Sequence, residues 1–412
     1  MPRCGLLGRT LAHSYSPAIH KALGGGYSYE LFEIKPDALA SFLEQSDFHG
    51  LNVTIPYKQA VIPFCQSLSP TAAAIGSVNT LLRQPDGSLH GHNTDAAGFL
   101  AMLRQSGIRV AGKQVLVLGS GGSSLTVCHV LREQRVAKIT VISRKGEHTY
   151  ESLPRHSGAQ ILINTTPVGM YPATGESLVN LAFFPHLEGV LDLIYNPART
   201  RFLMDAKMRN IPHMGGLPML VGQAAAAAEL FSGRPIDTEQ VNRTLYQLRR
   251  QMENIVLIGM PGSGKSTIGH LLHKCTGRPL IDTDRKIEQE AKMPIPEIFQ
   301  REGEAAFRAR ETEVLEEWGK ESGLIISTGG GVVTREENYR HLHQNGMIFF
   351  LERPLSKLER TGRPLSRGDI AKMYERRHPQ YQRFADYTVQ NNEGEPDMVA
   401  DTILELFMGK FQ

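Results

Sequence analysis

A glycine-rich segment that leads into Lys265 and Ser266 constrains this chain more than any other feature of its sequence. In Gly259-Met-Pro-Gly-Ser-Gly-Lys265-Ser266, two glycines enclose four residues directly before the lysine. The apolar run at 254–258 predicts a buried strand before this segment, and residues 266–274 predict a helix after it. A loop between such elements presents backbone N–H groups and a helix N-terminus to a polyphosphate. The segment therefore predicts nucleotide binding rather than a plain glycine turn.

Length and composition leave room for further domains. The loop begins only at residue 259 of 412, so more than half of the chain must belong elsewhere. Hydrophobic (41%) and charged (21%) contents are typical of a globular protein, and apolar strands alternate with amphipathic helices in an α/β pattern. The net charge of +3 and the lack of an 18-residue apolar run argue against nucleic-acid and membrane partners. Four widely spaced cysteines predict neither zinc nor disulfides, so we expect a cytoplasmic protein, and an oligomer is compatible with the sequence.

A second glycine loop follows a predicted strand at 113–118. This Gly-Ser-Gly-Gly turn is a weak signal by itself, but a helix and a strand at 138–142 follow it. That strand ends in Ser143-Arg144-Lys145. At this position NAD sites carry an acid that binds the ribose 2′-hydroxyl, whereas NADP sites carry basic residues that bind the 2′-phosphate. The sequence favours NADPH, although Arg144 and Lys145 as solvated turn residues are the alternative. The predicted cofactor residues are Gly119, Ser120, Gly121, Gly122, Ser143, Arg144 and Lys145.

Four clusters of hydroxyl and amide residues precede this second loop. They lie at 13–17, 50–58, 75–80 and 91–95, each at a predicted strand end or turn. Such side chains suit recognition of a polyhydroxylated small molecule. For Asn52 and Thr80, local capping or turn chemistry is the preferred interpretation.

Together and in this order, these motifs closely resemble shikimate dehydrogenases over residues 3 to about 235. The resemblance also includes Asn164-Thr-Thr-Pro-Val-Gly-Met170, Asp192-Leu-Ile-Tyr195-Asn-Pro and Gly216-Leu-Pro-Met219-Leu-Val-Gly-Gln223. It implies a catalytic Lys58–Asp95 pair, in which the lysine gives a proton to the alkoxide formed by hydride transfer. It further implies that Met219 and the Gly216 backbone lie near the nicotinamide. The implied substrate-binding residues are Ser14, Ser16, Thr54, Lys58, Asn79, Asp95, Tyr195 and Gln223.

Two departures from the shikimate dehydrogenase pattern concern the NADP domain. The segment between Arg144 and Asn164 is shorter than is usual in the family, so we expect a trimmed domain. Ser143 and Lys145 replace the family's usual Asn and Thr on either side of the arginine.

Acidic, glycine and arginine motifs follow the first loop. Residues 279–282 predict a strand that runs into two acids, with Asp282 suited to hold Mg²⁺ through water and Asp284 suited to accept a substrate hydroxyl proton. Next come a predicted helix at 303–308, Gly329-Gly330-Gly331 after a strand, and arginine motifs at 360–365 and 377–381. The predicted nucleotide-binding residues of the loop are Gly262, Ser263, Gly264, Lys265, Ser266 and Thr267, with Ser266 and Asp282 at the metal.

This set closely resembles shikimate kinases over residues 254 to about 390. The resemblance implies catalytic Lys265 and Asp284, and a substrate carboxylate clamped by Arg308 and Arg377. It places the backbone of Gly330 and Gly331 against the substrate ring, and lid residues Arg360 and Arg363 over the nucleotide. Few residues separate Arg363 from Arg377, so we expect a short lid.

The sequence as a whole predicts a bifunctional α/β enzyme that uses NADPH, ATP and Mg²⁺ to convert 3-dehydroshikimate to shikimate and shikimate to its 3-phosphate. The predicted domains are a substrate domain at 1–100 with helices at 222–250 packing back, a Rossmann-like NADP domain at 101–221, and a P-loop kinase domain of the nucleoside-monophosphate-kinase type at 251–412.

Each part carries its own motifs, so residues 1–250 and 251–412 are expected to work separately. The rivals are an NAD-dependent quinate/shikimate dehydrogenase fused to a kinase, and a non-catalytic ligand-sensing regulator.

Overall fold

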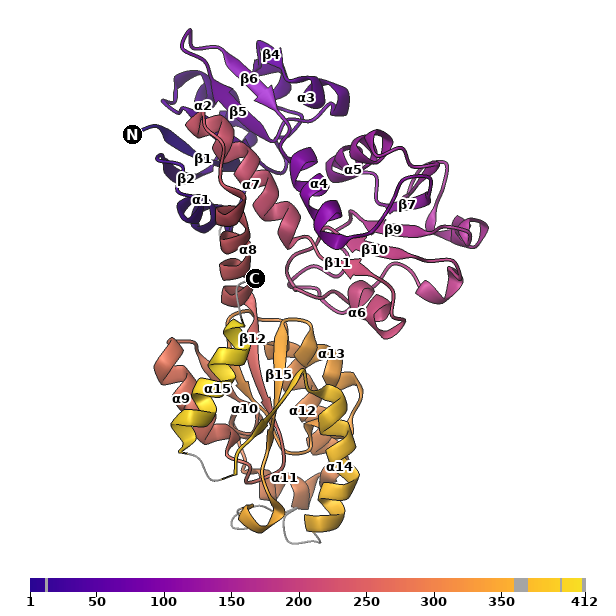
Figure 1. Ribbon diagram of the computed structural model, residues 1–412, viewed down its shortest axis with the longest axis vertical. Coiled ribbons are helices and arrows are strands. Elements are labelled where there is room, and N and C mark those ends of the chain that lie inside the picture. The colour runs from indigo at the N-terminus through magenta and orange to yellow at the C-terminus, as the bar shows by residue number, and fades with distance from the viewer. Residues whose placement is uncertain (12–13, 359–369, 393–394, 410–412) are drawn as a thin grey trace. The chain divides into compact units, whose positions relative to one another are not determined.

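The computed structural model of the protein describes residues 1–11, 14–358, 370–392 and 395–409, and the chain forms two compact units (Figure 1). Unit 1 comprises Met1–Val168, Leu178–Tyr195 and Asp205–Leu248. Unit 2 comprises Gly169–Ser177, Asn196–Met204 and Arg249–Gln412. Two short stretches that the sequence assigns to the NADP domain therefore belong to unit 2. The three-domain division itself stays a prediction.

Unit 1 begins with a mixed six-stranded sheet in the order β2-β1-β3-β5-β6-β4. The first strand pairs in parallel with β2 and β3, whereas β5 pairs antiparallel with both β3 and β6. Its core side chains include Leu7, Leu51, Val53 and Leu81. The strands are β1 (Arg3–Gly8), β2 (Ser28–Glu33), β3 (Gly50–Val53), β4 (Ser67–Leu68), β5 (Thr80–Arg83) and β6 (Leu89–His92), and the helices are α1 (Ser16–Leu23), α2 (Leu39–Gln45) and α3 (Pro70–Ile75).

The second sheet of unit 1 is parallel throughout, in the order β11-β10-β9-β7-β8. Its central strands are continuous apolar runs because helices cover both faces of such a sheet. A 3₁₀ helix at Tyr150–His156 connects β8 to β9 in place of an α-helix, in the segment that the sequence shows to be short. The elements are β7 (Gln114–Leu118), α5 (Gly122–Glu133), β8 (Lys138–Ile142), β9 (Ile161–Asn164), β10 (Gly189–Asp192), α6 (Arg201–Met208) and β11 (His213–Met214). The later helix α8 (Thr238–Met252) instead contacts the first part of the chain, where Gln240 donates to the Ala22 carbonyl.

Helices α4 (Asp95–Ser106) and α7 (Leu217–Ser232) lie side by side in unit 1 (Figure 1). Two glycines permit this close approach. A Cβ at Gly98 would come within 2.5 Å of the Met219 carbonyl, and a Cβ at Gly222 within 3.1 Å of the Ala101 Cβ. The contact brings Asp95, at the start of one helix, near Met219 and Gln223 on the other.

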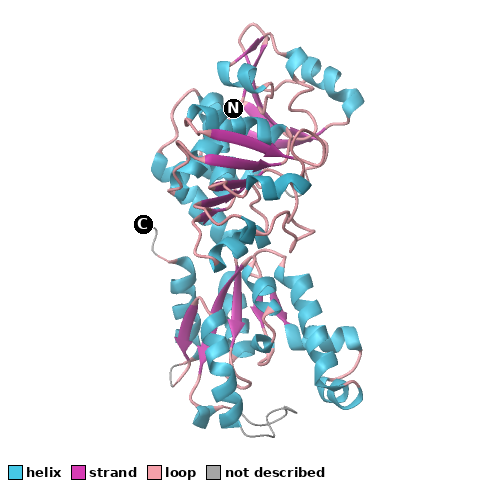
Figure 2. Cartoon of the chain, turned by 90° about the vertical axis from the view of Figure 1, so that its right-hand side faces the viewer, coloured by secondary structure: helices cyan, strands magenta, loops and turns pink. Residues whose placement is uncertain are grey.

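Unit 2 is built on a parallel sheet in the order β13-β14-β12-β15-β16, with helices on both faces (Figure 2). Alternate residues of the central strand enter two separate cores, Val256 and Ile258 on one face and Ile255 and Leu257 on the other. The elements are β12 (Asn254–Ile258), α9 (Lys265–Thr276), β13 (Leu280–Asp282), α10 (Thr283–Ala291), α11 (Ile295–Arg301), α12 (Gly303–Gly319), β14 (Ile325–Ser327), α13 (Glu337–His343), β15 (Gly346–Glu352), α14 (Ile370–Phe384), β16 (Tyr387–Gln390) and α15 (Pro396–Met408). The predicted α/β fold class is therefore confirmed, and the strands and helices predicted around the phosphate loop are present. Within the described ranges, no helix has the length and hydropathy needed to cross a bilayer.

Ala198 and Arg199 are integral parts of unit 2. The Ala198 N–H donates to Asn345 Oδ1 at 2.7 Å, and the Arg199 N–H donates to the Gln344 carbonyl at 2.8 Å. The Arg199 guanidinium donates to the carbonyls of His343 (2.8 Å) and Gly346 (3.2 Å), and it pairs with Glu253 at 3.0 Å. These bonds hold the turn between α13 and β15. Residues 251–412 alone would lack them, which the expectation of two separable parts overlooks.

Arg199→Ala is expected to lower the free energy of unfolding of unit 2 by about 2 kcal/mol, because buried carbonyls and the nearly buried Glu253 would lose donors. The loss is limited because Glu253 keeps its pair with Arg250 at 2.6 Å. The midpoint of thermal inactivation of the activity carried by unit 2 measures the effect. Arg209→Ala, at an exposed position just after α6, is the matched control. Equal midpoints for the two variants would show that the Arg199 bonds add nothing to stability.

Candidate functional sites

A cavity of about 430 Å³ in unit 1 is the first candidate site. All ten residues that the sequence assigns to substrate or nicotinamide in this part of the chain line it. They come from the loops after β1, β3 and β10, from the position just before β5, from the starts of α1 and α4, and from the beginning and second turn of α7. They are Ser14, Ser16, Thr54, Lys58, Asn79, Asp95, Tyr195, Gly216, Met219 and Gln223.

Lys58 and Asp95 form the charged pair of this cavity. The Lys58 Nζ donates to Asp95 Oδ2 at 2.6 Å, and both side chains are largely buried, with exposures of 24% and 13%. Asp95 is the first residue of α4, where the helix dipole stabilises a carboxylate. The Val78 N–H donates to the Lys58 carbonyl at 2.8 Å and fixes the loop that carries the lysine. The arrangement supplies an ammonium proton donor held in place by a carboxylate.

Buried amides and hydroxyls support the start of α4 from below. Asn79 Oδ1 accepts from the Thr94 N–H at 2.6 Å, directly before Asp95. Thr80 Oγ1 donates to Asn79 Oδ1 at 3.1 Å and accepts from Asn52 Nδ2 at 3.2 Å. Asn52 and Thr80 lie in β3 and β5, so their role in this buried network is structural but is not the local capping or turn chemistry that the sequence favours for them. Asn52 also lines the cavity, which that interpretation did not anticipate.

Aromatic side chains close another side of the cavity. Tyr15 and Tyr195 meet edge to face with ring centroids 6.1 Å apart, and both line the cavity. Burial raises the pKa of Tyr195, so its hydroxyl stays protonated and available as a donor. Sequence reasoning missed Tyr15, although it lies between Ser14 and Ser16, whose hydroxyl and N–H are joined at 3.2 Å.

A second cavity in unit 1, of about 790 Å³, lies at the carboxyl ends of β7, β8 and β9. Its lining includes the predicted cofactor residues Gly119, Ser120, Gly121, Ser143, Arg144 and Lys145. Gly122 is the first residue of α5 and lies outside this lining. Tyr150, Thr165 to Val168 and Leu178 complete the wall, and the sequence did not single them out for this role.

The glycines of this second cavity fit a dinucleotide. Gly119 has φ of +103°, and a Cβ there would meet Thr165 Oγ1 at 2.8 Å. A Cβ at Gly121 or Gly122 would meet nothing within 4 Å, so the backbone at the start of α5 faces open space where a phosphate can approach. Arg144 and Lys145 are exposed at the end of β8, as an NADP site requires.

The phosphate loop of unit 2 has the geometry that its sequence predicts. Gly259, Gly262 and Gly264 have φ of +150°, +82° and +95°, a region that favours glycine. Lys265 is 6% exposed, and its Nζ donates to the carbonyls of Gly259 and Met260 at 2.8 and 2.9 Å. The loop borders a cavity of about 110 Å³, also lined by Ser266, Thr267, Asp282, Asp284, Thr328, Gly330 and Arg353. Ser263 does not line it.

Hard oxygen ligands for magnesium meet beside this loop. The Ser266 hydroxyl donates to Asp282 Oδ2 at 3.0 Å, and Asp282 Oδ1 caps α10 by accepting from the Arg285 N–H at 3.2 Å. Asp284 lies in the first turn of α10 and lines the same cavity. A hydroxyl with neighbouring carboxylates fits Mg²⁺, which prefers oxygen ligands and keeps several waters.

The triple glycine of unit 2 lies against two acids and a proline as well as Arg308. A Cβ at Gly329 would come within 2.7 Å of Glu311 Oε1 and Asp284 Oδ1, one at Gly330 within 2.6 Å of Pro261, and one at Gly331 within 2.1 Å of the Arg308 guanidinium. No residue with a side chain fits these three positions without displacing its neighbours.

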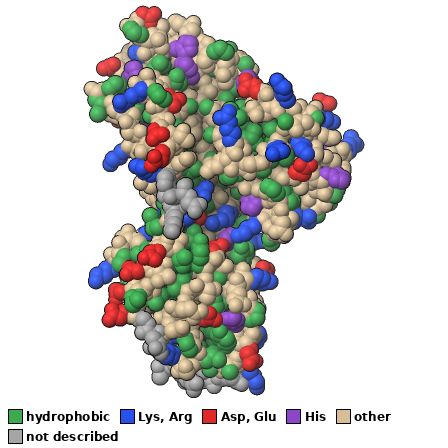
Figure 3. Space-filling view, viewed as in Figure 1, with side chains coloured by type: hydrophobic (Ala, Val, Ile, Leu, Met, Phe, Trp, Pro, Cys, Tyr) green, Lys and Arg blue, Asp and Glu red, His purple; other side chains and the backbone are tan. Residues whose placement is uncertain are grey.

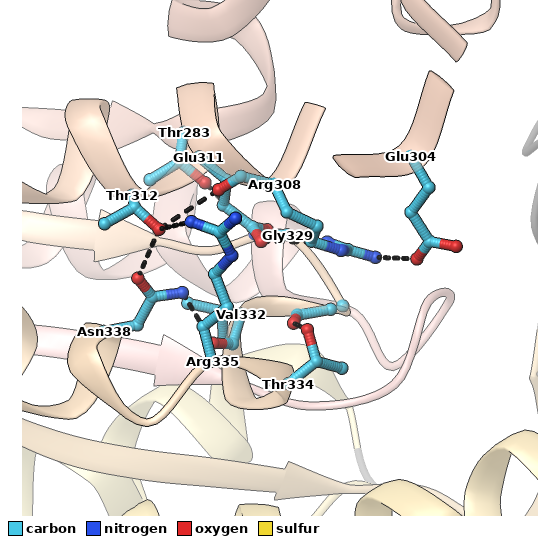
Figure 4. Close-up of polar contacts among 12 residues, drawn as sticks. Thr283, Glu304, Arg308, Glu311, Thr312, Gly329, Val332, Thr334, Arg335 and Asn338 are labelled. Carbon is cyan, nitrogen blue, oxygen red and sulfur yellow. Dashed lines mark hydrogen bonds and ion pairs between the residues drawn. The ribbon is translucent and has the colours of Figure 1, made fainter. Parts of the chain in front are cut away.

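Arg308 and Arg377 converge on this glycine loop. Arg377 donates to the Gly330 carbonyl at 3.0 Å, while Arg308 lies between Glu304 and Glu311 at 3.3 and 2.8 Å (Figure 4). Glu311 is fully buried, and burial raises its pKa despite the opposing effect of Arg308. Neither arginine lines the phosphate cavity, but Gly330 does. The predicted lid residues Arg360 and Arg363 lie outside the described residues.

Surface charge gives no sign of a polyanion-binding face on the side shown in Figure 3, where acidic and basic side chains occur next to one another in each unit. The four cysteines are free, and the described part of the chain contains no cluster of three or more His, Cys, Asp or Glu residues suited to a metal.

The geometry combines a dinucleotide-dependent oxidoreductase with a phosphate-loop phosphotransferase. Family models agree with this division. Residues 6–81 match the shikimate dehydrogenase substrate binding domain, 216–246 match the shikimate 5′-dehydrogenase C-terminal domain, and 261–407 match shikimate kinase.

Similar proteins and solved structures point the same way. The NADP(+) shikimate dehydrogenase of Clostridium beijerinckii is 37% identical over 263 residues, which cover 59% of this chain and 96% of that protein. A chorismate mutase/shikimate 5-dehydrogenase fusion protein from Clostridium acetobutylicum has a TM-score of 0.57 at 35% identity, covering 60% of this chain and 97% of that one. The Thermus thermophilus shikimate 5-dehydrogenase, solved with NADP(H) and shikimate, has a TM-score of 0.55 at 35% identity, covering 60% and 99%.

The chain belongs to the shikimate dehydrogenase family and carries a shikimate kinase domain fused to it. It is an NADP-dependent oxidoreductase and an ATP-dependent phosphotransferase of aromatic amino acid biosynthesis, with NADPH, ATP and Mg²⁺ as cofactors. The resemblance drawn from the sequence is thereby confirmed.

Proposed function

We propose that unit 1 reduces 3-dehydroshikimate to shikimate and that unit 2 phosphorylates the 3-hydroxyl of shikimate. The observation that carries the first step is the Lys58–Asp95 pair in a cavity that also holds Met219, Gly216 and a wall of hydroxyl and amide groups. The agreement of the two halves supports the direction, because the product of reduction is the substrate of the kinase.

In the reduction, bound NADPH supplies the hydride to the ketone carbon. The Lys58 ammonium donates a proton to the carbonyl oxygen of the substrate as that oxygen gains negative charge. Asp95 keeps the lysine oriented and accepts a hydrogen bond from a substrate hydroxyl. Asn79, Gln223 and the serines of the cavity bind the remaining polar groups.

In the phosphorylation, bound MgATP supplies the phosphoryl group. Lys265 and the loop N–H groups hold the phosphates, while Ser266 and Asp282 hold the metal. Asp284 accepts the proton of the attacking hydroxyl, and the arginines at Gly330 and Gly331 bind the substrate carboxylate.

The experiment that tests the proposal uses the full chain. Oxidation of NADPH with 3-dehydroshikimate measures the first reaction, and shikimate-dependent formation of ADP measures the second. A quinate dehydrogenase from Corynebacterium glutamicum solved with NAD is 26% identical, with a TM-score of 0.55, covering 60% of this chain and 98% of that one. Faster oxidation of quinate with NAD than of shikimate with NADP would therefore replace the proposed first reaction with that rival. Binding of both substrates without turnover would favour a regulator.

Cofactor choice gives a sharper prediction. Arg144→Asp is expected to lower the NADPH/NADH ratio of kcat/KM by at least about tenfold, roughly 1.4 kcal/mol, because a carboxylate would face the 2′-phosphate. Arg155→Asp, at an exposed position in the 3₁₀ helix, is the control with the same change of charge. If both variants shift the ratio equally, the phosphate is recognised elsewhere.

A further inference from the structure

Arg353 is a cationic side chain at the phosphate loop that the motifs of the sequence do not mark. It directly follows β15, the strand that pairs with β12 up to Phe350 opposite Ile258. Because the phosphate loop begins where β12 ends, this register places Arg353 beside the loop. It lines the 110 Å³ cavity together with Lys265, Ser266 and Asp284.

The Arg353 guanidinium is only partly used by the protein. One Nη donates to the Gly262 carbonyl at 3.2 Å, within the phosphate loop. The Nε–H is buried and meets no acceptor among the described residues. A buried donor left without an acceptor costs about 1–3 kcal/mol, so a ligand oxygen at this place would recover free energy.

No described carboxylate neutralises Arg353. The adjacent Glu352 is engaged elsewhere, accepting from the Tyr374 hydroxyl at 3.0 Å and bonding His378 Nε2 at 2.8 Å. Salt bridges of the described residues do not include Arg353, in contrast to Arg308 with its two glutamates. The charge of Arg353 is therefore available to a bound anion.

Among the described side chains that line the cavity, Arg353 is the second cation and balances the charge of two carboxylates. The described ionisable side chains that line it are Lys265 and Arg353 on one side and Asp282 and Asp284 on the other. Without Arg353, the described lining would carry a net charge of about −1. It would then repel a polyphosphate, which remains negative even with Mg²⁺ bound. A guanidinium suits this position because its planar fork presents several donors to phosphate oxygens.

We propose that Arg353 binds the terminal phosphates of the nucleotide while it braces the loop through the Gly262 carbonyl. This inference rests on the proposed kinase function of unit 2. The phosphate loop thus receives a positive charge from each of two neighbouring strands, Lys265 after β12 and Arg353 after β15.

The test compares the affinities of the full chain for ATP, ADP and AMP by titration calorimetry, with AMP measured by competition against ADP. Arg353→Gln keeps an N–H donor for Gly262 but removes the charge. We expect the Kd of ATP to rise about tenfold, that of ADP less, and that of AMP to stay within about twofold. Arg353→Lys, which keeps the charge without the fork, is expected to lie between wild type and Arg353→Gln.

Arg301→Gln is the matched control, because the Arg301 side chain is 65% exposed and pairs with Glu297 on its own helix. Equal weakening of ATP and AMP in Arg353→Gln would mean that Arg353 acts on the shape of the loop alone, and unchanged ATP affinity would mean that it makes no phosphate contact. Either result overturns the inference. Wild-type phosphorylation of shikimate is measured alongside, so that failure of the kinase function itself is recognised separately.

Discussion

Replacement of Lys58 by alanine is expected to reduce kcat of the reductase by about a thousandfold and to leave phosphorylation of shikimate unchanged. The Nζ, 2.6 Å from Asp95 Oδ2, is the ammonium donor that faces the cavity next to Met219 and Gly216. Without it, the alkoxide formed by hydride transfer has no positioned acid. Steady-state rates of both half-reactions on one preparation measure the effect, with binding of NADPH reporting that unit 1 is folded.

Lys113→Ala is the control for Lys58→Ala. Lys113 also pairs with a carboxylate, Glu188 at 2.7 Å, and its side chain is 27% exposed, close to the 24% of Lys58. Loss of such an ion pair outside the cavity is expected to change the reductase rate by less than about twofold. A reductase that keeps more than about a tenth of its kcat in Lys58→Ala would show that the proton comes from another group.

Local sequence predicted those parts of the molecule whose backbone demands a particular residue. Gly264 ends the phosphate loop with φ of +95°, and Gly331 lies against the Arg308 guanidinium, where a Cβ would come within 2.1 Å. Glycine is the residue that suits both positions, so the glycines of each motif predict the backbone conformation of the loop. The strand before the phosphate loop and the helix after it could be placed from the sequence because such a loop needs both, whereas for the triple glycine only the preceding strand was predicted, and a 3₁₀ helix at Val332–Thr334 follows it.

The features that the sequence left out depend on contacts between distant segments. Arg199 is an ordinary arginine in its own segment and becomes a structural residue only where it meets the turn at 343–346. Arg353 gains its place from the parallel register of β12 and β15, which no spacing in the sequence reveals. The domain boundary predicted near residue 250 rests on local sequence, which reports only on residues close together in the chain. It therefore could not reveal the contact between Arg199 and the turn at 343–346. Glu253, the single residue between α8 and β12, pairs with Arg199 and takes part in this contact.

Lys265→Ala and Asp284→Asn are both expected to lower kcat of phosphorylation by about a hundredfold or more, for different reasons. Lys265 is buried in the loop that holds the phosphates, so its loss is expected to raise the Kd of MgATP as well. Asp284 lines the cavity from the first turn of α10 and lies close to Gly329, and its replacement removes the base while the shape is kept. Calorimetric titration of each variant with MgATP and with shikimate separates the two roles. Asp397→Asn, at an exposed position in the first turn of α15, is the control for the carboxylate change, and the thermal unfolding midpoint of unit 2 reports on the fold of each variant. Equal losses of MgATP affinity in Lys265→Ala and Asp284→Asn would contradict this division, because Asp284 would then act on the nucleotide rather than on the hydroxyl that attacks it.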